Sequence, residues 1–175
     1  MSAPTRVAFL EGLRVMARYN RWMNERLYDC CEKLPEAERK RDRSAFFRSI
    51  HGTLNHLLLG DRLWLSRFLA REFRFGSLAE ELYSDFAELR HERAKTDAEI
   101  LEWIETLDED RLAGPLRFRS VVGNKDRSFP LWFAAQQFFN HQTHHRGQLT
   151  TLLTQAGIDL GVTDLLWLPG MEQNG

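Results

Sequence analysis

The chain has 175 residues, 43% of them hydrophobic, and its 24 basic and 25 acidic residues leave a formal net charge of −1. This length and composition predict one soluble globular domain over residues 1–175, with room for a substantial core. The balanced charge, without a basic stripe, argues against nucleic acid as a partner. Residues 1–20 contain no apolar run long enough for a signal peptide or a membrane span, so we expect a cytoplasmic protein without a membrane partner.

Four long stretches carry apolar residues at helical spacing. Pro35 should stop the first of them, and after a charged loop Ser44 is a candidate N-cap for the second. We expect these helices over about residues 6–33, over about residues 45–69, from a break at residues 76–77 to about residue 107, and over about residues 131–156.

The helical rhythm is broken by residues 114–130, GPLRFRSVVGNKDRSFP. Leu116 and Phe118 alternate there with arginines, and Gly123 and Asn124 supply turn chemistry, so this segment predicts a two-stranded hairpin. The expected fold class is therefore all-α: a four-helix bundle with a small β-hairpin or irregular crossover between the third and fourth long helices.

Three of the six histidines fall within NHQTHHRGQ, residues 140–148. His141 and His145 continue the apolar stripe that passes through Phe138, whereas His144 lies on a more polar flank. Residues four apart project from one face of a helix, which is the spacing by which a helix offers two nitrogens to one metal ion. The pattern is also compatible with two histidines at the core margin that bond to Gln, Asn or backbone groups.

A third ligand would have to come from another helix, and the second helix offers His51 and His56. Periodicity favours His51, which lies at the margin of the apolar stripe. His56 lies nearer a face of small residues, which is compatible with a polar pocket. The residues alone leave both histidines open as the third ligand.

Three segments together resemble the DinB/YfiT-like family of metal-binding four-helix bundles: YNRWMNERLY at residues 19–28, SIHGTLNHLLLGDRLWL at 49–65 and HQTHHRGQL at 141–149. The resemblance covers nearly the whole chain. It implies that His56, the histidine before the leucine pair, is the third ligand beside His141 and His145. Three imidazoles leave at least one position of a divalent ion open, and they suit zinc, nickel, copper or ferrous iron.

Each ligand histidine needs an acceptor for its second ring nitrogen. The candidates for that role, or for lining a pocket, are Asn20, Asn24, Asn55, Asp61 and Gln148. Arg146 is a candidate for holding an anionic substrate group, or for pairing with acidic residues at a subunit contact.

The resemblance also implies a function, with a small molecule as substrate. Relatives include S-transferases that use low-molecular-weight thiols, in which the metal activates a thiol that attacks a small electrophile, and metal-dependent hydrolases. A hydrolase needs a proton shuttle, and no HExxH-type glutamate accompanies these histidines, so we favour the transferase, although no residue is assigned to catalysis. The remaining alternative is a non-catalytic metal-binding stress-response protein. The family and the apolar pairs Phe138/Phe139 and Trp132/Phe133 make a homodimer plausible.

Overall fold

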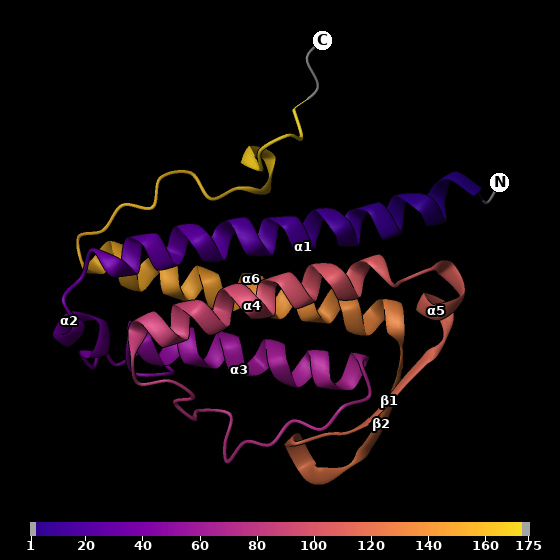
Figure 1. The fold of residues 1–175 in the computed structure, drawn as a ribbon, viewed down its shortest axis with the longest axis horizontal. Helices are drawn as coiled ribbons and strands as arrows, with labels where there is room; N and C mark the ends of the chain where they lie inside the picture. Colours follow the sequence, from indigo (N-terminus) through magenta and orange to yellow (C-terminus); the bar gives the residue numbers. More distant parts are fainter. Residues whose placement is uncertain (1–2, 173–175) are drawn as a thin grey trace.

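The computed structural model describes residues 3–172, with side chains described from residue 8 onward. Its four long helices lie side by side as a bundle (Figure 1): α1 (Ala3–Glu32), α3 (Ile50–Phe68), α4 (Phe86–Glu105) and α6 (Leu131–Gln155). Shorter elements join or follow them: α2 (Glu36–Lys40), α5 (Glu109–Ala113), β1 (Pro115–Arg119), η1 (Val122–Asn124), β2 (Asp126–Pro130) and η2 (Leu165–Trp167). The expected fold class is confirmed. The short helices α2 and α5 were not anticipated.

Each long helix packs against two others: α1 and α3 both contact α4 and α6 and so lie on opposite corners of the bundle. The buried apolar residues form two clusters. One contains Leu65, Trp103 and Phe138, and the other contains Leu58 and Leu149. Every long helix contributes to both clusters. Between its contributions to the two clusters, every long helix carries buried polar residues, so a polar layer crosses the middle of the bundle.

The start of α3 differs from the prediction. Ser44 and Arg48 have positive φ values of 55° and 64°, which interrupts a helix, and α3 begins only at Ile50. Ser49 is the N-cap, because its Oγ accepts a hydrogen bond of 2.9 Å from the Gly52 N–H. The intervening loop leaves Phe46 84% exposed, although it falls within the span expected for the second long helix.

The third long helix also starts later than the break at residues 76–77. Asp85 is its N-cap, with Oδ1 accepting from the Glu88 N–H at 2.8 Å. Residues 69–85 therefore form a long connection between α3 and α4, with one turn directly after α3 and another near Ser77, where the Glu80 N–H bonds to the Ser77 carbonyl. This connection runs along one side of α3 (Figure 1).

The predicted hairpin is present. Strands β1 and β2 pair antiparallel with Leu116 opposite Phe129, and the turn between them uses positive φ at Gly123 (73°) and Asn124 (45°). The hairpin packs against α3 and α6 at one end of the bundle. No helix in residues 3–172 combines the length and the apolar character needed to cross a bilayer.

The two apolar pairs that suggested a homodimer differ in their exposure to solvent. Phe138 and Phe139 are both buried inside the chain, so they provide no apolar surplus for a subunit contact. Trp132 and Phe133 are 42% and 45% exposed. Only the second pair remains available to a partner.

Candidate metal centre

The structure brings His56, His141 and His145 together between α3 and α6. The Nε2 atom of His145 lies 3.2 Å from that of His56 and 3.1 Å from that of His141. One nitrogen from each of the three rings lies within 4.8 Å of the others. Nitrogens bound at 2.0–2.1 Å to one tetrahedral ion would be about 3.3 Å apart, so the spacing fits a shared cation.

The outer ring nitrogens favour the same interpretation. His56 Nδ1 lies 2.8 Å from the carbonyl oxygen of Leu78, and His145 Nδ1 lies 2.8 Å from Gln148 Oε1. Both oxygens only accept, so both Nδ1 atoms carry the hydrogen and each neutral ring directs an Nε2 lone pair at the other. Two lone pairs this close repel each other, and a cation between them would remove that repulsion. The residues present therefore fit a divalent metal.

Burial keeps these rings neutral. It lowers the pKa of His56 and the pKa of His141 to about 4 each, with smaller contributions from the neighbouring histidines. Burial also lowers the pKa of His145. Near neutral pH all three rings thus have the deprotonated Nε2 that a metal requires.

Two residues without polar side chains shape the cluster. The Phe47 ring stacks on His56, with centroids 3.7 Å apart and an angle of 16° between the planes, and it meets His145 edge-on at 5.5 Å. Gly60 lies beneath His141: a Cβ atom at this position would be 3.1 Å from His141 Cε1. Gly60 therefore leaves the room that the ring of His141 occupies.

The remaining histidines described by the structure lie outside the cluster of three. His51 is buried, with Nε2 at 2.9 Å from the Tyr83 carbonyl, and holds the connection between α3 and α4. His144 and His91 are exposed. Periodicity alone had favoured His51 over His56, so the rotation of α3 within the bundle differs from that inferred from its apolar stripe.

Of the candidates for accepting from a ligand histidine, Gln148 is in contact with one, at His145 Nδ1. Asn55 has another partner: its Oδ1 accepts from the Tyr83 N–H at 3.0 Å, and its Nδ2 donates to the Tyr83 carbonyl at 3.1 Å. Asn55 thus holds in place the connection between α3 and α4, which includes Leu78 and its carbonyl group. Because that acceptor is a main-chain group, no side-chain pattern pointed to it.

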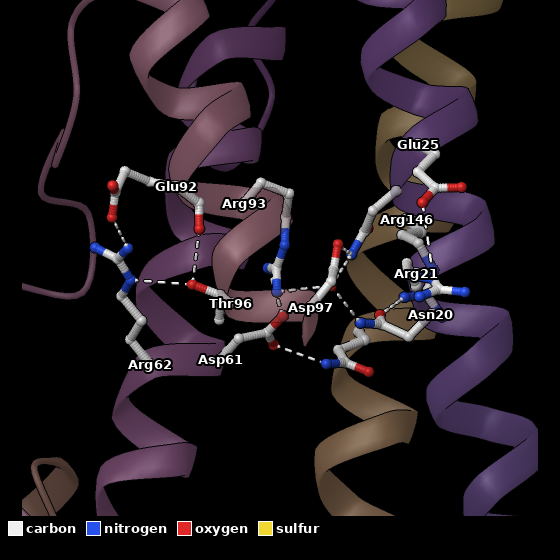
Figure 2. Close-up of polar contacts among 12 residues, drawn as sticks. Asn20, Arg21, Glu25, Asp61, Arg62, Glu92, Arg93, Thr96, Asp97 and Arg146 are labelled. Carbon is white, nitrogen blue, oxygen red and sulfur yellow. Dashed lines mark hydrogen bonds and ion pairs between the residues drawn. The ribbon is translucent and has the colours of Figure 1, made fainter. Parts of the chain in front are cut away.

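The other candidates belong to the polar layer (Figure 2). Arg93 Nη1 donates to Asp61 Oδ2 at 2.6 Å, and Arg93 Nη2 lies 2.9 Å from Asp97 Oδ1. Asn20 and Asn24 donate to the same Asp97 carboxylate at 3.0 and 2.9 Å. These side chains join α1, α3 and α4, and no hydrogen bond connects them to a ring of the histidine cluster.

Arg146 is part of this layer. It is 3% exposed and donates to Asn20 Oδ1 and, at 3.3 Å, to Thr143 Oγ1. The guanidinium also lies 5.3 Å from the centre of the Tyr19 ring, and burial lowers the pKa of Arg146 to about 10. Its buried position and internal partners correct both expectations for Arg146, because the guanidinium faces neither a substrate pocket nor a subunit contact.

Sequence reasoning missed Arg93 and Asp97, which lie in the strongly polar segment RHERAKTD of the third long helix. Their i, i+4 spacing was the available signal, because it suits an ion pair on one helix. That the pair is buried could not be inferred from a segment so rich in charges. Its burial follows from the matching polar residues on the other three helices.

A pocket of about 560 Å³ opens beside His56 and His141. Its walls come from α3, from α6 and from the hairpin. Most of the lining side chains are apolar, and they include Leu63, Phe118 and Phe133. A small molecule in this pocket would therefore reach the histidine cluster.

Comparisons with known proteins show which family and fold the chain shares. The DinB family model matches residues 1–175. Protein DinB of Bacillus subtilis (strain 168) is 25% identical over 160 residues, covering 83% of this chain and 87% of that protein. The crystal structure of a DinB-like protein from Bacillus cereus ATCC 10987 has a similar fold, with a TM-score of 0.60 at 18% identity over 80% of this chain and 89% of that chain.

Proposed function

The chain belongs to the DinB family, and from that premise we propose that it binds a divalent transition metal through His56, His141 and His145 and acts as a metal-dependent thiol S-transferase. One observation carries the proposal: three neutral imidazole nitrogens converge beside a pocket large enough for a small molecule. A bound divalent ion would supply Lewis acidity that favours the deprotonated, nucleophilic form of a thiol at neutral pH. Zinc, nickel and ferrous iron all suit the three nitrogens.

The chain's own residues would hold and orient the reactants. Leu78 and Gln148 fix the ring hydrogens of His56 and His145, so that the free nitrogens face the same point. Phe47 covers one side of the cluster, while the pocket beside His141 leaves another side accessible. The apolar walls would exclude water from an electrophile held there.

A metal-dependent hydrolase is the alternative enzyme, and it is less well supported. Hydrolysis needs a group that moves a proton, usually a carboxylate beside the metal. Neither an Asp nor a Glu lines the pocket among the described residues. Asp61, the candidate on α3, is held by Arg93 and Gln142 in the polar layer.

The metal content of untagged protein tests the site. We expect stoichiometric metal in wild type and its loss in His56→Ala, His141→Ala and His145→Ala, each checked for folding by circular dichroism. The exposed His144→Ala and the buried His51→Ala should retain metal. Metal absent from wild type, or kept equally in the first three variants, would refute the site.

The reaction has its own test. Metal-loaded protein is mixed with an electrophile such as 1-chloro-2,4-dinitrobenzene and with cysteine, glutathione or coenzyme A, and thioether formation is followed. We expect turnover that requires both the metal and a thiol. Intact metal binding without thiol-dependent turnover would reject the transferase and leave the hydrolase and the non-catalytic stress-response protein as the functions to test.

We also propose that the protein acts as a homodimer, supported by the exposed Trp132 and Phe133 on α6. Light scattering coupled to size exclusion measures the mass in solution. A mass of one chain would reject the dimer.

A further inference from the structure

The pocket beside the histidine cluster has a charged end. Arg67, on the last turn of α3, lines it together with Arg127 of the hairpin. We propose that Arg67 binds the carboxylate, or a similar oxyanion, of a substrate whose apolar body lies between α3 and the hairpin. The inference rests on the proposed function in taking the histidine cluster as the reacting centre, and it names the class of substrate: an electrophile with an anionic group remote from the reacting atom.

The surroundings of Arg67 leave its charge uncompensated. The guanidinium carbon lies 4.7 Å from the centre of the Trp64 ring and 4.2 Å from that of Phe118. Burial between these rings lowers the pKa of Arg67 to about 10. Stacked guanidinium groups keep their edge N–H donors free in the plane of the group, which is the arrangement that receives a carboxylate.

The neighbouring arginines in the chain, which line a different pocket beside α4, are paired. Arg62 is bonded to Glu92, and Arg71 to Glu99. Arg67, between them in the chain, is within ion-pair distance of no acidic side chain in residues 8–172. The part of the pocket wall that the structure describes contains two arginines and no carboxylate, so its potential favours an anion.

The spacing along α3 sets the shape of the ligand. His56, Gly60 and Arg67 lie on one side of the helix and line the same pocket. The eleven residues from His56 to Arg67 correspond to roughly 16 Å along the helix axis. Helical side chains lean toward the N-terminus, and the stacking of Arg67 on Trp64 shows this lean, so the guanidinium lies closer to the cluster than its Cα atom does.

The ligand therefore needs an apolar segment of several carbon–carbon bonds between the anion and the reacting atom. The walls that would contact this segment are Leu63, Phe118, Val121, Phe129, Phe133 and Ala134. Arg146, which the sequence had suggested for the anion, is enclosed in the polar layer. We therefore assign the anion-binding role to Arg67, at the opposite end of the pocket from the histidines, instead of to Arg146.

The test compares two ligands of one shape, 4-phenylbutyrate and its neutral amide, by ¹H–¹⁵N correlation spectra of the zinc-loaded protein and of the protein treated with a chelator. We expect wild type to bind the acid about tenfold more tightly than the amide in both metal states, as for one charge-assisted hydrogen-bonded pair. Arg67→Met should abolish this preference. Arg67→Gln, which keeps a polar head, serves as a second variant should the first not fold.

Arg117→Met is the matched control, because Arg117 is exposed on β1 one position from Phe118 and does not line the pocket. It should keep the preference for the acid. Equal binding of acid and amide to wild type, a preference that survives loss of Arg67, or a preference seen only with zinc would each overturn the proposal. Absence of metal or of thiol transfer would refute the proposed function and leave this result unchanged, so the two failures are distinguishable.

Discussion

At the scale of single residues, the geometry of the histidine cluster depends on close contacts as much as on the histidines. The His141 ring occupies space that any side chain at residue 60 would share. The neutral state of the rings depends on burial, which disfavours the imidazolium form. Both features lead to measurable consequences.

Gly60→Ala should weaken metal binding by about tenfold, the lower end of what altered ligand orientation usually costs. The added Cβ would lie 3.1 Å from His141 Cε1, so the ring must shift by a few tenths of an ångström. Gly147→Ala is the control: nothing lies within 4 Å of a Cβ there, and removing this glycine from a helix interior should stabilise the fold by about 0.5–1 kcal/mol. Competition with a chromophoric chelator measures the affinities, and equal affinities in the two variants would contradict the prediction.

The metal-free protein should lose stability as the pH falls. The folded-state pKa values of His56 and His141 are about 4, below the ordinary value of 6.5. Between these values the unfolded chain takes up protons that the folded chain does not, so the stability present above about pH 6.5 is lost as the pH falls toward about 4. Urea midpoints across this range measure the effect.

The control for this pH dependence is the double variant His56→Gln/His141→Gln. Its urea midpoint should vary less with pH, and the remaining slope is attributed to His51 and His145, whose pKa values are also lowered by burial. The same slope in wild type and in the double variant would show that these two rings are not held neutral.

At the scale of the elements, apolar periodicity predicted four long helices, and capping decided where they begin. Ser44 and Ser49 are both suitable N-cap residues, five positions apart. Ser49 is the N-cap because the preceding loop is not helical. In that loop Asp42 Oδ1 accepts from the Ser44 N–H at 2.9 Å, and Ser44 and Arg48 both have positive φ. This turn carries Phe47 to the histidine cluster instead of into a helix.

Ser49→Ala should destabilise the protein by about 1 kcal/mol, since the Gly52 N–H loses its acceptor. Ser44→Ala is the matched control and should change the free energy of unfolding by less than about 0.5 kcal/mol, because Ser44 caps no helix. Chemical denaturation gives both values. A larger loss from Ser44→Ala would place the start of α3 at the residue predicted from sequence.

At the scale of the whole molecule, the polar layer divides the core into two apolar clusters and ties three of the long helices together through Arg93. Asp61 and Asp97 come from α3 and α4, and Asn20 comes from α1. Buried charges are tolerated only when paired, so this layer requires one relative arrangement of the helices. Gln142 of α6 also donates to Asp61, at 2.9 Å, so the layer sets how α3 faces α6, on which the histidine cluster depends.

Arg93→Met should destabilise the protein by about 3–5 kcal/mol, because two buried carboxylates would lose their cation. Arg90→Met is the control on the same helix: Arg90 also bridges two carboxylates, Asp29 and Glu32, but its side chain is 37% exposed. Its loss should cost less than about 1 kcal/mol. Equal losses in thermal or urea unfolding would show that the layer does not hold the bundle together.

Most of the fold could be predicted from the sequence, since helices and hairpins follow from local periodicity and turn residues. His141 and His145 were found in the same way, because both lie on one helix whose geometry is known. The choice of His56 over His51 came from a family resemblance, because periodicity within α3 does not determine which side of the helix faces α6.

The sequence by itself therefore determined the four long helices, the hairpin, their order and the pair of histidines on α6, all of which depend on interactions between residues close in the chain. Only the tertiary structure decided the rest: the rotation of α3 that brings His56 to the pair, the Leu78 carbonyl that orients its ring, and the burial of Arg93 and Arg146. The physical reason is that each of these depends on groups from different helices or loops. Their positions follow from packing the whole bundle at once.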